Sequence, residues 1–428
     1  MLRNMLILTL VLCLSVTPQI IAQDSLSLQD CIDLAFENNY TIKNSQLELK
    51  AAQRARQSAL TNYFPSISAG RLQWNAETAL LALELSDASM GLLKKGSIDY
   101  IGAVQPLFTG GRIVNGNRLA RLGVDVSTIK ENIARNDVVL KTEAFYWQII
   151  SLQEKALTIR AYEEMLDSLL KQVEDAYASG IVMQNDVLRV RLKRSEVLLD
   201  KSRLDNGFEQ ARMALCQFLG LPLNSRIVLV DSLKVEASPQ ALKVHHSQAL
   251  PARSEYKLLE LSVKAEKLQT NLVRGEYLPQ AAVGINYQRL KFDENDSRSF
   301  SMIYGTVSIP ISGWWGGSHE LNKRKQEERI AENNMRDSFE LLLLQMEKSW
   351  QDLNDAYTQY QLSEQARVQA VENLKVNQDS YDNGLTPVSD LLDARAMLQQ
   401  SQDQVAEAKT HFLTERSRYL QVTGRLKH

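Results

Sequence analysis

The chain has 428 residues with 49 basic and 51 acidic side chains, so its overall charge provides no attraction to nucleic acid. Only nine prolines and nineteen glycines interrupt this length. So few breaking residues favour long helices and argue against a doubly wound α/β enzyme. We therefore expect a mainly α fold with a small β part.

The first 22 residues have the pattern of a secretory signal peptide. Arg3 precedes an apolar run from Met5 to Val16, and the small residue Ala22 follows. We expect cleavage near Ala22–Gln23 and export of the chain. A retained membrane anchor is the alternative, although the apolar run is short for a membrane span.

The remainder of the chain is predicted to be a tandem repeat. YASGIVMQNDVLRVR (177–191) matches YDNGLTPVSDLLDAR (381–395), and QPLFTGGR (105–112) aligns with IPISGWWG (309–316), both 204 positions apart. Stretches before Gly70 align at an offset of 214 instead, so the first copy has a longer loop after that glycine. A register kept over so many residues indicates a duplication.

We expect residues 23–220 to form the first repeat, 221–250 a linker with short elements, and 251–428 the second repeat. Each repeat is predicted to contain a helix, two strands, a very long helix, a turn and a returning helix. In the first copy these elements are a helix at 28–62, strands at 66–75 and 97–108, and a helix at 112–178. The helix at 112–178 would extend about 100 Å, a length that favours a tube or a coiled coil.

Apolar residues in 145–177 and 339–360 recur with an alternating 4-3 spacing. This is the spacing of a heptad seam, which packs against a partner helix. We interpret its aromatic members as packing residues, not as a cofactor site. The sequence therefore predicts that the long helices form coiled-coil hairpins.

The predicted strands alternate apolar side chains with small or polar ones. The apolar members are Val283, Ile285 and Tyr287; Phe300, Met302 and Tyr304; and Ile98, Tyr100 and Val104. Strands of about ten residues with this alternation are typical of a membrane barrel, and half-buried soluble hairpins are the alternative. Four strands cannot close such a barrel, so several chains would have to share one.

Aromatic residues cluster where the predicted strands meet the helices. They are Tyr63, Phe64, Tyr277, Trp314 and Trp315. Such side chains prefer the interface between a membrane and water. Their position supports the membrane interpretation of the strands.

No catalytic or metal-binding motif stands out in the sequence. His245 and His246 are adjacent, but neither has a partner at metal-ligand spacing. There is no phosphate-binding glycine loop, nucleophile elbow or closely spaced cysteine pair. We therefore predict no enzyme activity, no metal and no cofactor. Cys31 and Cys216 are expected to be small buried residues of helices, with a disulfide as the alternative.

The signal peptide, the tandem repeat with two strands and long helices in each half, and the YxxG…DxLxAR-like turn together resemble the outer-membrane efflux proteins of TolC type. The resemblance extends over Leu26–Leu426. It implies a homotrimer in the outer membrane of a Gram-negative bacterium, with four strands per chain in a 12-stranded β-barrel that contacts membrane lipid. The long helices would form an α-barrel across the periplasm.

The function implied by the resemblance is a passive exit duct for tripartite efflux or type I secretion. A periplasmic adaptor would couple it to an inner-membrane pump of the RND or ABC type. A secreted or surface-bound coiled-coil scaffold without a pore is the alternative. The scaffold explains the heptads and the export signal, but not the strand pairs at equivalent points of both copies.

The resemblance also assigns roles to residues near the two turns. Gly180 and Gly384 lie at the helix-turn tips, where a reversing chain often needs positive φ. Asp186 and Asp390 begin the returning helices, where a carboxylate complements the helix dipole and can cap. Both capping roles would apply whether or not the protein forms a channel.

Asp390 and Asp393 match the positions at which acidic rings narrow the periplasmic entrance of such channels, with plain solvated caps as the alternative. Tyr381, Asn185 and Asp186 match residues that link the two helix pairs in a closed state. The better-known members carry an arginine where this chain has Thr386. We therefore expect the charged latch to be missing or built differently.

Overall fold

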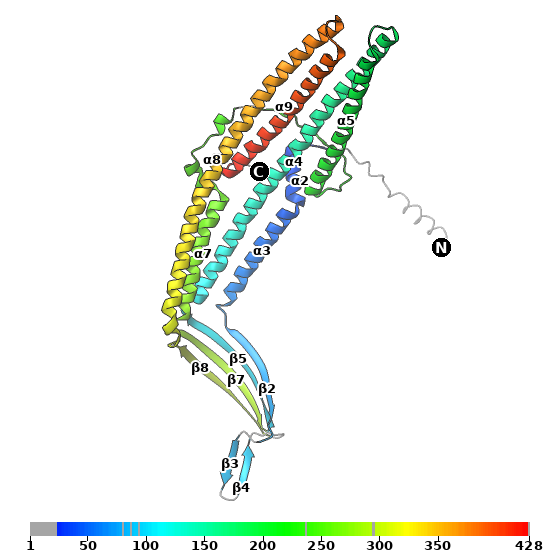
Figure 1. The fold of residues 1–428 in the computed structure, drawn as a ribbon. Coiled ribbons are helices and arrows are strands. Elements are labelled where there is room, and N and C mark those ends of the chain that lie inside the picture. Colours follow the sequence, from blue (N-terminus) through cyan, green and yellow to red (C-terminus); the bar gives the residue numbers. More distant parts are fainter. Residues whose placement is uncertain are drawn as a thin grey trace, which may run out of the picture. The chain divides into compact units, whose positions relative to one another are not determined.

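The computed structural model describes residues 24–78, 81–85, 88–92, 95–235, 238–292 and 296–426. The predicted signal peptide, residues 1–22, lies outside the described residues. Long helices and a small sheet make up the chain (Figure 1), so the predicted mainly α fold with a small β part is confirmed. Among the described helices, none combines the length and the apolar character that crossing a membrane would require.

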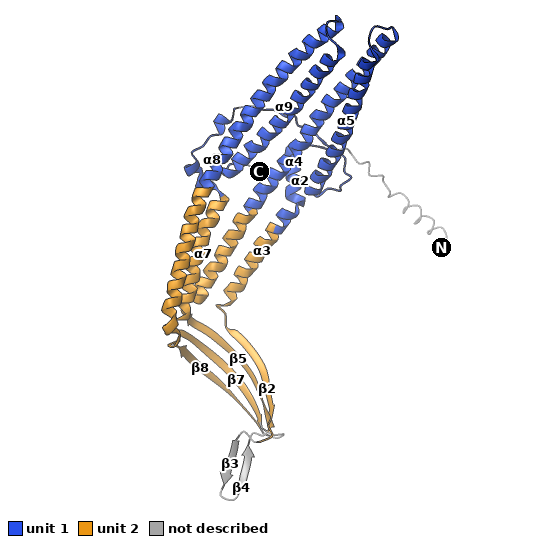
Figure 2. Cartoon of the chain, viewed as in Figure 1, with its two compact units in different colours: residues 1–44, 132–253, 342–428 blue, residues 45–131, 254–341 orange. Residues whose placement is uncertain are grey.

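The chain divides into two compact units, each assembled from separate stretches of sequence (Figure 2). Unit 1 comprises Met1–Asn44, Asn132–Arg253 and Leu342–His428, and unit 2 comprises Ser45–Glu131 and Ser254–Leu341. Both units therefore take residues from both halves of the sequence. Helix α4, Arg112–Ala178, and helix α8, Gly313–Asp382, contribute to both units.

Unit 2 contains a four-stranded antiparallel sheet in the order β2-β5-β7-β8. The strands are β2 Ser66–Asn75, β5 Lys95–Thr109, β7 Gln280–Phe292 and β8 Asp296–Ser308. Helices α3, Tyr40–Thr61, and α7, Ser254–Glu276, precede β2 and β7, while α4 and α8 follow β5 and β8. The central β5–β7 pairing thus joins a strand from each half of the chain.

A separate hairpin occupies the connection between β2 and β5. It consists of β3, Leu81–Leu85, paired with β4, Ala88–Leu92. The repeat comparison predicted only a longer loop here. The hairpin escaped prediction because the second half of the sequence has no matching stretch, so the alignment offered nothing to compare it with.

Strand register determines which side chains share a face of the sheet. The aliphatic face carries Ile67, Ile101, Val283, Ile285, Tyr287, Ile303 and Val307. The glycine face carries Gly70, Gly102 and Gly284, together with Tyr100, Phe300, Met302 and Tyr304. The apolar positions predicted strand by strand therefore do not coincide: those of residues 283–287 lie on one face, and those of 98–104 and 300–304 lie on the other.

Tyrosine rings cover two glycines on the glycine face. Tyr100 lies opposite Gly70, and Tyr304 lies opposite Gly284. A Cβ atom at Gly70 would come within 2.6 Å of the Tyr100 hydroxyl, and one at Gly284 within 2.4 Å of the Tyr304 ring. These tyrosines are thus packed flat on the sheet, which explains how large rings share a face with small residues.

Unit 1 contains two helix hairpins and a set of short elements. The hairpins are α4 with α5, Gln184–Phe218, and α8 with α9, Val388–Val422. The short elements are α2 Leu28–Asn38, β1 Asp24–Leu26, β6 Ile227–Leu229, η1 Pro239–Leu242, α6 His246–Ala249 and η2 Leu250–Ala252. The predicted helix at 112–178 is observed as α4 with the same ends.

The predicted helix at 28–62 is wrong in one respect, because it is broken at Asn39 into α2 and α3. Asn39 has extended geometry, with φ −64° and ψ 131°. Its Oδ1 accepts a hydrogen bond from the Thr41 amide at 2.8 Å, and its Nδ2 donates to the Phe218 carbonyl at 2.9 Å. The side chain thus satisfies backbone groups of two helix ends, a use that favours asparagine at helix boundaries.

Asp231 fastens the segment between the two halves to the helices of unit 1. Its Oδ2 accepts hydrogen bonds from the Tyr146 hydroxyl at 2.7 Å and from the Leu28 amide at 2.9 Å. Tyr146 is fully buried, and burial together with the Asp231 contact raises the pKa of its hydroxyl. Parallel pairing of β1 with β6 extends the same attachment.

Cys31 and Cys216 are both buried free thiols, as predicted. Burial raises the pKa of Cys31 to about 12, and the nearby charges of Asp30 and Asp231 act in the same direction. Because the thiolate is the reactive form, this thiol is chemically inert at neutral pH.

Polar contacts connect the two hairpins along α4 and α9. Lys155 forms an ion pair with Glu407, and the Thr158 hydroxyl donates to Asp403 Oδ1 at 3.4 Å. Burial raises the pKa of Asp403, with the nearby Lys155 charge opposing the shift. The interface between the hairpins thus contains a carboxylate whose charged form is disfavoured by its surroundings.

The junction between β5 and α4 should not tolerate a side chain at Gly110. This residue has φ +64°, and a Cβ would lie 2.2 Å from the Gly275 carbonyl oxygen of α7. We expect Gly110→Ala to lower the free energy of unfolding by more than the left-handed backbone cost alone, about 1–2 kcal/mol. At Gly207 in α5, an added Cβ would have no other atom within 4 Å, so Gly207→Ala should stabilise the helix by up to about 1 kcal/mol. Thermal unfolding in detergent compares the two, and a Gly110→Ala protein as stable as the wild type would contradict the packing described.

Stability should depend on pH through Asp403. Its folded pKa lies above the ordinary value of 3.8, so between the two values the folded chain binds more protons than the unfolded chain. Stability contributed by this group is present at low pH and falls as the pH rises through the raised value. We expect Asp403→Asn to melt at a higher temperature than wild type at pH 7, with the difference vanishing toward pH 4. Asp205→Asn, at an exposed position of α5, is the control and should leave melting unchanged.

Candidate functional site

The two helix hairpins of unit 1 reverse through the same backbone motif. In the first tip, Gly180 has φ +73° and the Ile181 amide donates to the Ala176 carbonyl at 2.9 Å. In the second tip, Gly384 has φ +70° and the Leu385 amide donates to the Ser380 carbonyl at 2.8 Å. This six-to-one bond with a left-handed glycine is the Schellman motif. Both glycines therefore have the conformation that the sequence predicted for them.

A hydrophobic cluster joins the tips below these turns. Its buried members come from α4, α5 and α9: Ile159, Tyr162, Leu166, Leu169, Val173, Val187, Val190, Val197, Val388, Leu391 and Leu392. Tyr381, at the end of α8, is partly buried against the same cluster. The two hairpins are thus packed together near their tips by apolar contacts. The heptad stripes predicted this burial, although the first stripe ends early, since Tyr177 is exposed.

Asp186 and Asp390 occupy equivalent places but make different contacts. Asp186 Oδ2 accepts a hydrogen bond from the Met183 amide at 3.3 Å, which satisfies a backbone donor at the start of α5. Pro387 stands at the equivalent position before α9 and has no amide hydrogen. Asp390 instead accepts from the Ser389 hydroxyl at 3.1 Å. Only Asp186 therefore makes the backbone contact expected of a cap.

Asp390 and Asp393 are both exposed on α9. The residues between and beside them, Leu391, Leu392 and Ala394, are buried in the hairpin interface. The two carboxylates therefore share the helix face that points away from their own chain. In that position they are available to meet other charged groups or solvent.

The residues predicted to link the two tips, Tyr381, Asn185 and Asp186, differ in their surroundings. Burial raises the pKa of the Tyr381 hydroxyl, and the charges of Asp186 and Asp382 act in the same direction. Asn185 is exposed, and within the described part of the chain no hydrogen bond connects it to the second tip. The structure thus places Tyr381 against the hydrophobic cluster of the tips and Asn185 on the exposed surface.

Thr386 does not replace the arginine of the better-known relatives with another polar link. Its hydroxyl oxygen is buried and has no hydrogen-bond partner among the described residues. Polar contacts between the hairpins occur elsewhere along α4 and α9, among them Lys155 with Glu407 and Thr158 with Asp403. Sequence reasoning missed them because each pair joins helices about 250 positions apart, and no local pattern encodes such a pairing.

The aromatic residues predicted at the ends of the strands lie in unit 2. The Trp314 indole donates to the Tyr277 carbonyl at 2.8 Å, and the Tyr277 ring packs over Gly317. Trp315 is 81% exposed and Phe64 is 64% exposed. Large exposed rings on a water-facing surface are unfavourable, so their exposure suits a membrane boundary. Tyr63 is also exposed, and its carbonyl accepts from Gln105 at 3.0 Å.

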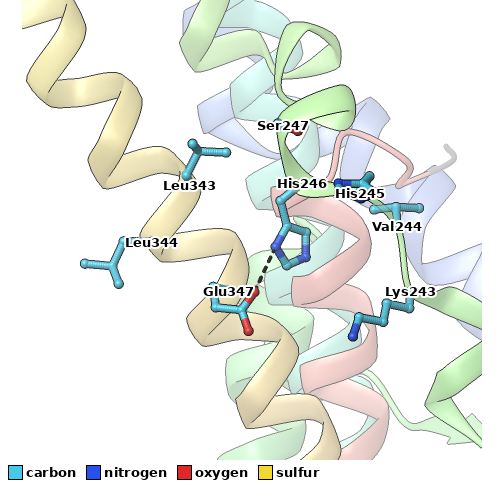
Figure 3. Close-up of a pocket in the computed structure, with 8 residues that line it drawn as sticks. All are labelled: Lys243, Val244, His245, His246, Ser247, Leu343, Leu344 and Glu347. Atoms are coloured by element: carbon cyan, nitrogen blue, oxygen red, sulfur yellow. Dashed lines mark ion pairs between the residues drawn. The ribbon is translucent and has the colours of Figure 1, made fainter.

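A pocket of about 800 Å³ lies between the segment 243–247 and helix α8 of unit 1 (Figure 3). His246 points into it, with Nδ1 3.2 Å from Glu347 Oε2 and Nε2 3.3 Å from the Tyr419 hydroxyl. These contacts attach the segment to α8 and α9, which is a structural role. The described residues contain no group of three or more His, Cys, Asp or Glu side chains arranged to hold a metal ion.

Comparisons with known proteins agree with this architecture. One curated relative is the outer membrane protein TolC of Vibrio cholerae, 19% identical over 303 residues, which are 68% of each chain. The solved Campylobacter jejuni CmeC outer membrane channel has a TM-score of 0.81 at 14% identity, covering 94% of this chain and 86% of that one. The open state of the Neisseria gonorrhoeae MtrE outer membrane channel has a TM-score of 0.76 at 16% identity, covering 94% and 89%. At such identities these structures establish the fold.

The family relationship is established by a broader match. The model of the family described as "Outer membrane efflux protein" matches residues 31–221 and 246–425, which together are most of the chain. The resemblance to TolC-type efflux proteins and the outer-membrane location that the sequence predicted are thereby confirmed. The chain belongs to the outer membrane efflux protein family.

Proposed function

We propose that three copies of this chain form an exit duct through the outer membrane, as part of a tripartite efflux or type I secretion system. The observation that carries this proposal is the open sheet of unit 2. Its outer strands, β2 and β8, each have one neighbour within the sheet. An unpaired strand edge does not occur in the hydrocarbon of a membrane, because its amide and carbonyl groups would be left without partners.

The strand directions allow copies of the chain to close the sheet. All three pairings in the order β2-β5-β7-β8 are antiparallel, so β2 and β8 run in opposite directions. A β8 strand can therefore pair with β2 of the next copy and continue the antiparallel pattern around a ring. Closure removes every edge.

The number of copies follows from the space that a duct needs. Two copies would give eight strands, and barrels of that size are filled by their own side chains or hold one small ligand. Three copies give twelve strands and leave a lumen. Three is thus the smallest number that provides a passage, and it agrees with the homotrimer implied by the resemblance to TolC-type proteins.

Coupling to other proteins is the second part of the proposal. An outer-membrane duct has no energy source of its own, and it has no catalytic role in our proposal. A periplasmic adaptor and an inner-membrane pump of the RND or ABC type would provide the driving force. Membership in the efflux family supports this arrangement, and the exposed residues of the two tips offer a surface for it.

The exposed pair Asp390 and Asp393 would form the acidic entrance of the duct. A threefold axis would bring six carboxylates around one passage, since each copy contributes two. At a separation of about 6 Å, two such charges repel by roughly 0.7 kcal/mol even at the dielectric constant of water. A ring of this kind attracts cations and repels anions.

The oligomer is tested by native mass spectrometry of the protein purified in detergent. We expect complexes with three times the mass of the mature chain, which survive mild heating and conduct ions in a planar bilayer. A monomer that is soluble without detergent would refute the duct and favour a coiled-coil scaffold. A dimer that conducts would keep the duct but overturn the copy number.

The entrance is tested by measuring the ion selectivity of single channels. We expect Asp390→Ala/Asp393→Ala to reduce the preference for cations several-fold, because the charges that favour cations are removed. Asp379→Ala/Asp382→Ala is the matched control, since it removes two exposed carboxylates three positions apart at the end of α8. Equal selectivity in the wild type and the Asp390/Asp393 variant would reject the acidic entrance while leaving the duct intact.

A further inference from the structure

The aliphatic face of the sheet in unit 2 ends in a row of charged side chains. Arg71, Asp99 and Arg289 lie directly opposite one another on β2, β5 and β7. Arg71 and Asp99 form a two-point ion pair, with Nη2 2.9 Å from Oδ2. Lys291 lies on the same face two residues beyond Arg289, opposite Ser97.

Positive charge predominates in this row. The described side chains on this part of the aliphatic face include the cations Lys95, Arg71, Arg289 and Lys291, and one carboxylate, Asp99. Ser297 and Ser299 of β8 extend the row with hydroxyl groups. With Asp99 paired to Arg71, the side chains of Arg289 and Lys291 remain exposed. We call Arg71, Arg289, Lys291 and Lys95 the cationic row.

The other face differs at the same height. Its described side chains there include Leu72, Ile98, Leu290, Gln288 and Phe300, and its described cation is Arg298. The concentration of positive charge is therefore a property of one face and not of the end of the sheet as a whole. Arg298 lies next to Ser299, one step from the cationic row but on the opposite side.

The cationic row directly adjoins the apolar surface. An exposed aliphatic band lies below it, formed by Val283, Ile285 and Tyr287 of β7 and by Ile67, Ile101 and Ile303 on the neighbouring strands, with the partly exposed Ala281 at its far end. The eight steps from Ala281 to Arg289 cover about 27 Å along the strand, comparable with the apolar band of about 25 Å on membrane barrels. Tyr277 and Trp314 mark the helix end of this band. Cations and aromatic rings thus lie at its two ends.

We propose that the cationic row binds the phosphate groups of lipid headgroups in the membrane leaflet away from the helices. A guanidinium offers a planar fork of donors that matches phosphate, and the lysines and serines add further donors. The ligand is a lipid rather than free phosphate, because acyl chains of the same molecule would cover the aliphatic band below its headgroup. The inference rests on the proposed function only in taking the aliphatic face as the lipid-facing one.

Lipid binding is tested by titrating the detergent-solubilised oligomer with lipid A, a glycolipid with two phosphates, and counting bound lipid by native mass spectrometry. A cation near an anionic membrane surface contributes about 1 kcal/mol, which is about a fivefold change in affinity. We therefore expect Arg289→Gln to weaken binding about fivefold and Arg289→Gln/Lys291→Gln about 25-fold. Arg289→Lys, which keeps the charge, should retain most of the binding.

Arg298→Gln is the matched control, since it makes the same substitution on the neighbouring strand but on the glycine face. We expect it to bind lipid A like the wild type. The same lipid without its phosphates, and inorganic phosphate at the same concentration, should bind weakly to every form. Arg289 is the primary position because it lies directly opposite Asp99, within the row of Arg71, Asp99 and Arg289.

Three results would overturn the inference: wild-type binding by both Arg289→Gln and the double variant, an equal loss in Arg298→Gln, or equal binding of the dephosphorylated lipid. If Arg289→Gln does not assemble, Lys291→Gln provides the same comparison. Single-channel conductance of each variant separates the two proposals. If the variants conduct ions and bind lipid like the wild type, the lipid-binding role of the cationic row is rejected and the duct stands. If the wild type itself does not conduct, the duct is rejected.

Discussion

The unpaired edges of β2 and β8 are the constraint on which the rest of the proposed assembly depends. Backbone groups inside a membrane need hydrogen-bond partners, and a sheet of four strands cannot supply them at its own edges. The duplication provides two strand pairs, and the β5–β7 pairing joins them within one chain. In the proposed assembly, neighbouring copies of the chain do the remaining pairing. Subunit association is then a condition for the sheet to exist in the membrane, not an addition to a finished channel.

The helix hairpins combine apolar packing with polar contacts of limited strength. The cluster under the tips, which includes Leu166, Val190 and Leu391, keeps the hairpins together by burial. Lys155 with Glu407 and Asp403 with Thr158 add polar contacts, one of which includes a carboxylate that burial disfavours in its charged form. Among the described residues Thr386 makes no hydrogen bond, whereas polar contacts between the hairpins occur along α4 and α9.

The two faces of the sheet carry different kinds of side chain, and this difference cannot be seen in the sequence of a single strand. One face combines aliphatic side chains with a row of cations at its end, as a surface between lipid chains and phosphate headgroups requires. The other combines glycines with tyrosine rings that lie flat over them. Such a face is compatible with a lumen, because it also carries polar groups such as Asn286 and Gln288.

The sequence by itself determined the order of the elements and the positions of the turns. The ends of α4 and the left-handed glycines Gly180 and Gly384 were predictable because local chemistry controls them: an unbroken run of helix formers, then a residue that tolerates positive φ. Only the tertiary structure decided which strand faces coincide, that Asn39 breaks a helix by bonding to Phe218, and that Lys155 meets Glu407. These features depend on register and on contacts between segments far apart in the chain. A one-residue shift of register moves every side chain to the opposite face, and no local pattern records that choice.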